Sequence, residues 1–413
     1  MPSHPSTRRR GAPPLTENLP DPSCADADPE VAAALAAELR QRQGSLAMTA
    51  AGQRPLPVPP EHAALERLAD GRAKALFDAT FAHVLPATEV PAHQLALLAL
   101  LAPHDTVLCL DHPFGGHGVR SALAAVPGRP YDVVPYGLRT SDGQVDMAEV
   151  ARLARAHLPA VIVVGGAVHP RIPDLAHFRQ LADEVGALLM VDMTCFAGPV
   201  AAGLRPSPVS RAHVVTADLH ETLDGAGGGV LLTDDRHLAT RLASIAAAHR
   251  RGGLPGQLLA AQAVALRGAT SAAFRDRQER ALRGARILAG RLLADDVAET
   301  GARVVTGSTE TPLVLIDLAH SVPAAGRAGE RLRSLGIRPH TTGEHGLCLG
   351  TTALAGRGFD DASFRAVADV IARALPPEPH VVTLDELGAR VAALTNRHPI
   401  AVSAEASRAT QAP

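Results

Sequence analysis

The stretch VVTADLHETLDGAGGGVLL, residues 214–232, contains the features that decide the fold of this chain. It begins with the β-branched pair Val214 and Val215 and ends with the apolar run 230–232. A polar segment and four glycines lie between these runs. Apolar runs bounded by glycine-rich turns are typical of strands. We therefore predict a strand, a polar loop over 218–229 that resembles an active-site loop, and a second strand.

Further apolar runs upstream alternate with segments of helical periodicity. Strands are predicted at 106–110, 132–134, 160–164 and 187–191, with helices at 147–157 and 175–185. This alternation predicts an α/β fold with a mostly parallel sheet covered on both faces. Functional sites in such sheets lie beyond the carboxyl ends of the strands. The loops expected there are 111–118, 165–171, 192–197 and 218–229.

The flanking regions predict a second, smaller α/β domain and two polar ends. Helices are expected at 30–42, 61–77, 238–293 (interrupted at 251–256) and 384–395, and strands at 313–316 and 347–349. We divide the chain into a disordered arm with one helix (1–50), a large domain (51–250), linking helices with a small domain (251–402), and a disordered tail (403–413).

Composition argues against several classes of partner. The formal net charge is −2, and the one basic run is Arg8–Arg10, so nucleic acid and membrane surfaces have no electrostatic support. The four cysteines are scattered without CxxC spacing, which is typical of a reducing compartment. No run of about 20 apolar residues and no signal peptide is recognisable. We expect a cytoplasmic protein without a membrane span.

Short motifs in a fixed order resemble the serine hydroxymethyltransferase family. The matching segments are 15–18, 105–108, 115–117, 131–137, 183–187, 191–193, 252–253, 357–359 and 397–399. The resemblance extends from about residue 15 to residue 400. It implies the fold type I architecture of pyridoxal-phosphate enzymes, with a mostly parallel sheet between helices in the large domain and a smaller C-terminal α/β domain. Fold alone does not determine function.

The resemblance also implies that the central chemical group of the family is missing. The family's polar loop carries a lysine that binds pyridoxal phosphate as a Schiff base, and the matching residue here is Glu221. A carboxylate cannot form an imine. Lys74 is the only lysine in the chain, and its helical surroundings predict a solvated helix face. We therefore expect no covalently bound cofactor.

Other positions that bind ligands in the family are altered as well. Cys348 stands where an arginine would bind the substrate carboxylate, a task that suits a planar guanidinium. The segment Thr88-Glu89-Val90 replaces the phosphate-binding loop, and Glu89 would repel a phosphate. Ala167 and Cys195 replace the serine and histidine that flank the cofactor ring. The acid–base glutamate and tyrosines have no counterpart near 46–56.

Some family positions keep their residue type. Asp192 matches the aspartate that pairs with a pyridinium nitrogen, His117 the histidine that stacks on the ring, and His220 the neighbour of the missing lysine. Structural roles as a loop cap and a satisfied polar residue are the competing interpretations for Asp192 and His117. The candidate cofactor contacts are His117, Asp192, Thr88, Gly252 and Gly253, and the candidate substrate contacts are Cys348 and Arg171.

Three functional interpretations remain open. The favoured one is a pseudoenzyme that binds a metabolite, or forms a homodimer or a heterodimer with a related pyridoxal-phosphate-fold subunit. The second is a repurposed enzyme acting on a small amino-acid-like metabolite, with Glu221, His220 and Asp218 as acid–base groups. The third holds pyridoxal phosphate or pyridoxamine phosphate non-covalently. The spacing Asp-x-His-Glu is not a metal signature, so no metal site is predicted.

Overall fold

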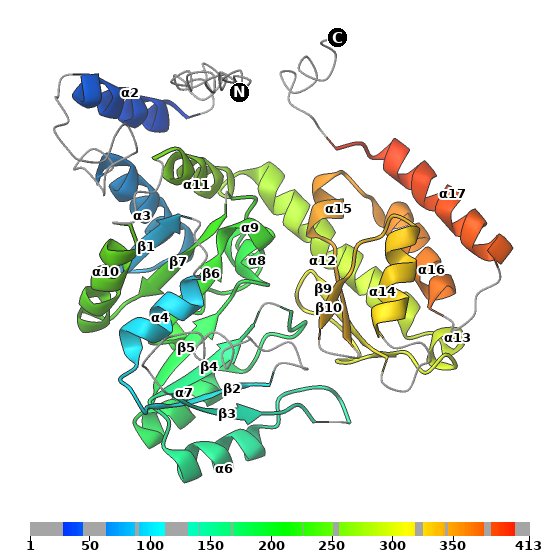
Figure 1. Ribbon diagram of the computed structural model, residues 1–413, viewed down its shortest axis with the longest axis horizontal. Helices are drawn as coiled ribbons and strands as arrows, with labels where there is room; N and C mark the ends of the chain where they lie inside the picture. Colours follow the sequence, from blue (N-terminus) through cyan, green and yellow to red (C-terminus); the bar gives the residue numbers. More distant parts are fainter. Residues whose placement is uncertain are drawn as a thin grey trace, which may run out of the picture.

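The computed structural model consists of a larger lobe and a smaller lobe, joined by a long helix (Figure 1). The structure describes residues 28–43, 63–86, 91–111, 131–139, 141–166, 168–225, 227–250, 256–318, 325–342, 346–375 and 381–400. The predicted disordered segments before residue 28 and after residue 400 lie outside this part of the chain. None of the described helices is long and apolar enough to cross a membrane.

A seven-stranded sheet forms the larger lobe, in the order β1-β7-β6-β5-β4-β2-β3. Its strands are β1 (Phe81–Pro86), β2 (Thr106–Leu110), β3 (Asp132–Tyr136), β4 (Val161–Gly165), β5 (Leu188–Asp192), β6 (Val214–Asp218) and β7 (Gly228–Thr233). The strands from β3 to β6 are parallel, whereas β7 and β1 are antiparallel to their neighbours. The predicted mostly parallel sheet is confirmed. The edge strand β1 was not predicted.

Helices cover both faces of this sheet, as the apolar strands require. One face packs against α4 (Ala92–Leu100) and α10 (Arg236–Arg250). The other face packs against α3 (Ala63–Phe77), α6 (Met147–His157), α7 (Leu175–Val185), α8 (Ala197–Ala201) and α11 (Gly256–Gly268). In β5, Met190 points to the first face while Leu189 and Val191 point to the second. Continuous apolar strands therefore reflect burial on both sides.

The smaller lobe is built on a four-stranded antiparallel sheet, in the order β10-β11-β9-β8. Its strands are β8 (Arg303–Val304), β9 (Leu313–Asp317), β10 (His340–Thr342) and β11 (Gly346–Gly350). Its helices are α13 (Asp295–Ala298), α14 (Ala325–Ser334), α15 (Thr352–Gly356), α16 (Asp361–Ala374) and α17 (Val381–Arg397). The long helix α12 (Ala272–Leu292) packs against α8 of the larger lobe and α16 of the smaller one.

Helix boundaries follow local capping chemistry. The predicted helices at 147–157 and 175–185 are found as α6 and α7 with the same bounds. The carboxylates of Asp146 and Asp174 accept backbone N–H bonds at their starts, and left-handed residues end both helices. The predicted helical region 238–293 contains α10, α11 and α12, and its predicted interruption at 251–256 matches the break between α10 and α11. The second break was not predicted; there Ser271 caps the start of α12 by accepting a bond from the Phe274 N–H.

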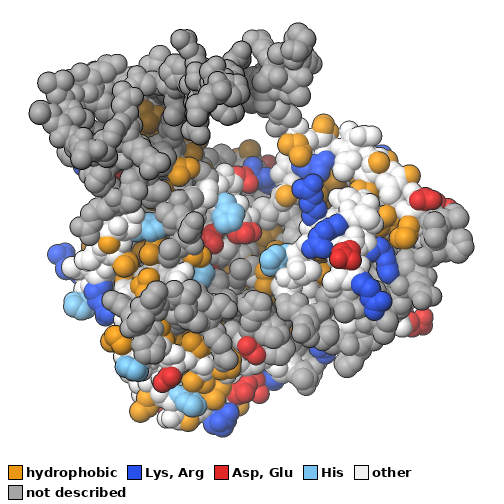
Figure 2. Space-filling model, in the orientation of Figure 1, with side chains coloured by type: hydrophobic (Ala, Val, Ile, Leu, Met, Phe, Trp, Pro, Cys, Tyr) orange, Lys and Arg blue, Asp and Glu red, His pale blue; other side chains and the backbone are white. Residues whose placement is uncertain are grey.

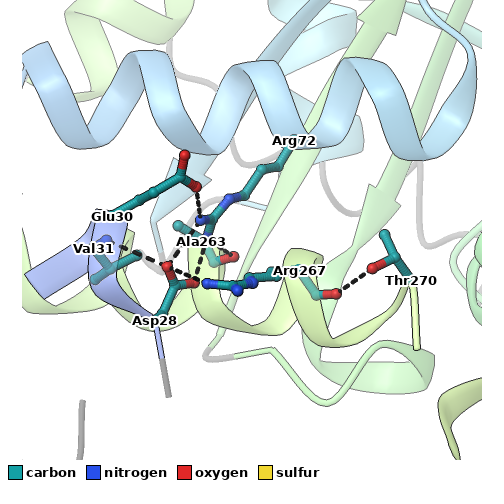
Figure 3. Close-up of polar contacts among 7 residues, drawn as sticks. All are labelled: Asp28, Glu30, Val31, Arg72, Ala263, Arg267 and Thr270. Atoms are coloured by element: carbon teal, nitrogen blue, oxygen red, sulfur yellow. Dashed lines mark hydrogen bonds and ion pairs between the residues drawn. The ribbon is translucent and has the colours of Figure 1, made fainter. Parts of the chain in front are cut away.

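A buried carboxylate attaches helix α2 (Pro29–Gln43) to the larger lobe (Figure 3). Asp28 accepts bonds from the Arg72 guanidinium at 2.6 and 2.9 Å and from Arg267 at 3.0 Å, while its side chain is 1% exposed. Arg72 lies on α3 and Arg267 on α11. Burial by itself would raise the pKa of Asp28, but the bonds from Arg72, Val31 and Arg267 outweigh it and lower the pKa.

Asp28→Asn should release α2 from the larger lobe. The amide keeps the size of the side chain but removes its charge, leaving the mostly buried Arg72 with incomplete compensation. We expect a loss of about 3 kcal/mol in the free energy that docks α2. Hydrogen exchange of the α2 amides measures this local opening directly.

Glu30→Gln is the matched control, because Glu30 also binds Arg72 but its side chain is 69% exposed. Its effect should stay below about 1 kcal/mol. Since the pKa of Asp28 is lowered in the folded state, its contribution is present above the unfolded value of about 3.9 and is lost as the pH falls through the folded pKa. Equal α2 protection in wild type and Asp28→Asn at neutral pH would contradict this account.

Candidate functional site

The polar residues of the opening stretch lie at the carboxyl ends of two central strands. Asp192 is the last residue of β5 and Asp218 the last residue of β6. Part of the predicted loop after β6 forms a single helical turn, α9 (Leu219–Thr222). The backbone then turns through Asp224, which has a φ of 54° and whose carboxylate forms an ion pair with Arg277 of α12. The site therefore begins where a parallel sheet is expected to present it.

Asp192 is buried beneath α4, with only 1% of its side chain exposed. One carboxylate oxygen accepts a 2.8 Å bond from the Thr194 N–H, and the other lies 3.9 Å from Nδ1 of His93. The first contact is the loop-capping role that sequence reasoning offered as an alternative. His93, in the first turn of α4, was not identified from the sequence, because no motif connects it with a strand 99 positions later.

A chain of hydrogen bonds holds α9 in place. The Asp218 N–H donates to Thr194 Oγ1 at 3.0 Å, and Thr222 Oγ1 donates to the Thr194 carbonyl at 3.2 Å. Thr222 Oγ1 also accepts from the Gly198 N–H at 2.9 Å, and Gln278 Nε2 of α12 donates to the Thr222 carbonyl at 2.8 Å. These contacts connect β5, α8 and α9 with α12. Sequence reasoning missed Thr194, Thr222 and Gln278 as members of the site.

Close packing supports these bonds. A Cβ atom added to Gly198 would lie 2.5 Å from the Thr222 carbonyl oxygen and 2.7 Å from the Gln278 amide oxygen. Thr222 and Gln278 are both buried. Position 198 therefore has no room for a larger residue, because the α9 backbone and the Gln278 side chain of α12 lie close to it.

His220 and Glu221 point away from this buried network. Nε2 of His220 lies 3.2 Å from Oε1 of Glu221, and about half of each side chain is exposed. Two candidate site thiols are buried, Cys195 after β5 and Cys348 in β11 of the smaller lobe. The Cys195 thiol donates to the His169 carbonyl at 3.4 Å.

Nearby carboxylates add to the effect of burial on the pKa of both thiols. Burial raises the pKa of Cys348 to about 12, and the negative charge of Glu221 adds to the shift. Burial also raises the pKa of Cys195 well above its ordinary value, with further contributions from Asp192, Cys348 and Glu221. Glu221 of α9 therefore lies near enough to Cys195, in the loop after β5, and to Cys348 of β11 to influence both thiols, and Asp192 of β5 influences Cys195.

Other predicted site residues have different surroundings. Arg171 donates to Ser308 Oγ at 2.5 Å, and its Nε lies 3.8 Å from Oε2 of Glu310. It therefore contacts the segment that leads into β9 of the smaller lobe. The remaining candidates lie outside the described residues and stay predictions: Thr88, His117, Gly252 and Gly253.

The only lysine lies at the opposite end of the sheet. Lys74 is exposed on α3, and its carbonyl accepts a bond from the Ala79 N–H just before β1 begins. Strand β1 ends at Pro86, which pairs with Gly228 of β7. The next residue of β7, Gly229, pairs with Asp218 at the end of β6, so β1 ends at the edge of the sheet where β6 leads into α9. Strand β1 is about 17 Å long, at about 3.3 Å per residue. Lys74 lies near its first residue and Glu221 near the edge of the sheet where it ends, so most of the strand's length separates them.

The family of the chain follows from its sequence relatives. A family profile described as serine hydroxymethyltransferase matches residues 61–371. The chain belongs to the serine hydroxymethyltransferase family. The family resemblance and the pyridoxal-phosphate fold type I architecture expected from the sequence are confirmed by this match and by the seven-stranded sheet flanked by helices.

Individual relatives of the serine hydroxymethyltransferase family cover nearly the whole chain. Proteins named serine hydroxymethyltransferase 2 from Mycobacterium bovis and Mycobacterium tuberculosis are 39% identical to it, with 90% of this chain and 96% of the relative covered. The serine hydroxymethyltransferase of Kineococcus radiotolerans is 40% identical, with 95% and 97% covered. The similarity therefore includes both lobes.

The buried thiols should resist alkylation in the folded protein. Because the pKa of Cys348 is about 12 instead of 9.0, its thiolate fraction near neutral pH is roughly a thousandfold below that of a free cysteine. Iodoacetamide labelling followed by peptide mass spectrometry should leave Cys348 and Cys195 unmodified until the protein is denatured. Rapid labelling of Cys348 in the native protein would contradict its burial and its high pKa.

Thr222→Val should destabilise the site without changing the size of the side chain. The substitution removes the acceptor of the buried Gly198 N–H and the donor to Thr194, at a cost of about 2 kcal/mol in the free energy of unfolding. Thr240→Val is the matched control, because Thr240 is exposed on α10 and bonds only within that helix among the described residues. Equal losses in urea unfolding of both variants would refute the role of the network.

Proposed function

We propose that this chain is a serine hydroxymethyltransferase-family protein that works by binding, without a Schiff base to pyridoxal phosphate and without hydroxymethyltransferase activity. The observation that carries the proposal is the carboxylate of Glu221 on α9, beside His220 and close enough to Cys195 and Cys348 to raise the pKa of both thiols. A carboxylate at this position cannot condense with an aldehyde.

The residues present do not fit a covalently held pyridoxal phosphate. Imine formation needs an amine, and the single lysine, Lys74, is exposed near the far end of β1. The substrate side of the family site is altered too, because Cys348 is a buried neutral thiol and cannot pair with a carboxylate as an arginine does. We therefore derive no catalytic step through the cofactor.

The proposal includes assembly with a second subunit of the same fold. The chain aligns with its relatives over both lobes, so the surfaces through which such proteins assemble can persist while the site changes. A homodimer and a heterodimer with a related subunit are the two forms of this proposal. Size-exclusion chromatography with light scattering, alone and with an intact relative from the same genome, distinguishes them.

A repurposed acid–base enzyme is the second candidate, favoured by the His220–Glu221 pair. The 3.2 Å contact between an imidazole nitrogen and a carboxylate oxygen resembles the pairs that move protons in enzymes, and both side chains are half exposed. Asp218 precedes them at the end of β6. This candidate requires that Glu221→Gln and His220→Ala abolish turnover of a small amino-acid-like metabolite.

Non-covalent binding of pyridoxal phosphate or pyridoxamine phosphate is favoured by Asp192. Its carboxylate is buried at the end of β5 and one oxygen lies 3.9 Å from His93. A buried carboxylate of this kind is suited to a pyridinium N–H. Pyridoxamine phosphate that co-purifies without an imine absorbance band would support this alternative over the first proposal.

Borohydride reduction in the presence of pyridoxal phosphate tests the main proposal. Wild-type protein and Lys74→Arg should both lack a saturable internal-aldimine band, and reduction should fix no cofactor stoichiometrically to either chain. Any adduct on wild type should be slow, proportional to cofactor concentration and absent from Lys74→Arg, because Lys74 is a solvent-exposed amine.

A saturable, stoichiometric adduct at Lys74 would overturn the proposal. An intact family member treated in parallel supplies the positive control for band formation and reduction. Hydroxymethyl transfer from serine by the purified chain at the rate of that control would overturn it equally. These two outcomes are independent of any ligand that the chain binds without the cofactor.

A further inference from the structure

We infer that the site at the carboxyl ends of β5 and β6 binds a small cationic amine and disfavours the carboxylate of an amino acid. This inference rests on the proposed function and names the ligand class of the same site. It follows from the charges that meet at the lobe junction, from the partners of the nearby arginines, and from a buried hydroxyl group beside Asp192.

Three carboxylates converge on the site, with His220 beside Glu221 and His93 beside Asp192. Glu221 and Asp218 lie on and next to α9, and Asp192 lies at the end of β5. The two thiols that complete the site are uncharged, since burial raises the pKa of Cys195 and of Cys348. Figure 2 shows acidic and histidine side chains gathered where the two lobes meet on the visible face. Such a potential attracts a cation.

The arginines at the junction already have acceptors. Arg171 contacts Ser308 and Glu310, and Arg277 contacts Asp224. Arg205 donates to the carbonyls of Leu204 and Glu310. The Nε atom of Arg277 has no acceptor among the described residues, so the arginines do not by themselves exclude a carboxylate. The charge of Glu221 repels an entering carboxylate and attracts an ammonium group.

A buried hydroxyl group provides an independent indication of a ligand. Thr216 of β6 is fully buried, and its Oγ1 has no hydrogen-bond partner among the described residues. Thr216 is the register partner of Asp192 in the parallel β5–β6 pair, so both side chains project from the same face of the sheet. Buried hydroxyl groups are normally satisfied.

Asp192 and Thr216 together suit the N–H donors of an amine. The carboxylate oxygens and the hydroxyl oxygen accept hydrogen bonds, and an ammonium group has three donors and no acceptor. Glu221, half exposed on α9, then presents a second carboxylate nearer the solvent. A second carboxylate in addition to Asp192 favours amines with a second polar or cationic end, such as amino alcohols and diamines.

Matched ligand pairs test the inference. Ethanolamine and serine differ only by the carboxylate, as do putrescine and ornithine. Isothermal titration calorimetry of the full chain at low ionic strength should give a dissociation constant for each amine at least about tenfold lower than for its amino acid. Glu221→Gln should weaken amine binding about tenfold and reduce the discrimination within each pair.

Glu299→Gln is the control, because it removes one exposed carboxylate on the smaller lobe, at the end of α13. Its amine affinity should equal that of the wild type, which separates a local contact from the effect of net charge. Amino acids that bind as tightly as their amines, or millimolar amines that give no heat and no thermal shift, would overturn the inference. Equal weakening by Glu221→Gln and Glu299→Gln would also overturn it.

A failure of the amine-binding inference can be distinguished from a failure of the proposed function. Absence of amine binding together with absence of a borohydride-fixed cofactor defeats only the ligand class. A stoichiometric cofactor adduct defeats the proposed function, whatever the titrations give. Both experiments use the same preparation of full-length protein, so differences in folding between samples do not enter the comparison.

Discussion

The hydrogen bonds of Thr222 are the constraint on which the site depends. A single helical turn such as α9 is unstable by itself, because too few bonds offset the entropy of ordering it. Here three hydrogen bonds to Thr222 hold the turn: its hydroxyl donates to the Thr194 carbonyl and accepts from the Gly198 N–H, and its carbonyl accepts from the Gln278 side chain of α12. Leu219 and Thr222 therefore face inward. His220 and Glu221 consequently project toward the lobe junction.

This support is independent of the residue at position 221. None of the three bonds that hold Thr222 involves the Glu221 side chain. The strands, the packing and the α9 turn therefore do not depend on which side chain stands at position 221. The chain illustrates how a scaffold and the chemistry it displays vary separately.

Much of the fold could be predicted from the sequence, whereas contacts within the site could not. The helices α6 and α7 were predicted to the residue, since aspartates cap their starts and apolar periodicity marks their lengths. The two-residue strand β8 is too short for any period to be visible. Motif order drew attention to Asp192 and Glu221, whereas His93 comes from α4 and belongs to no recognisable pattern. Thr216 lies within the opening stretch, but nothing in the sequence shows that it is the register partner of Asp192.

The rigidity of α12 has a mechanical consequence. This 21-residue helix, about 30 Å long, carries Gln278 against α9 near its start and Gly284 against the Phe364 ring further along, where an added Cβ would come within 2.6 Å. The helix therefore packs against both lobes. A rotation of the smaller lobe relative to the larger lobe would therefore either bend α12 or displace the α9 backbone through the Gln278–Thr222 hydrogen bond. The position of Glu221 is in this way coupled to the orientation of the smaller lobe.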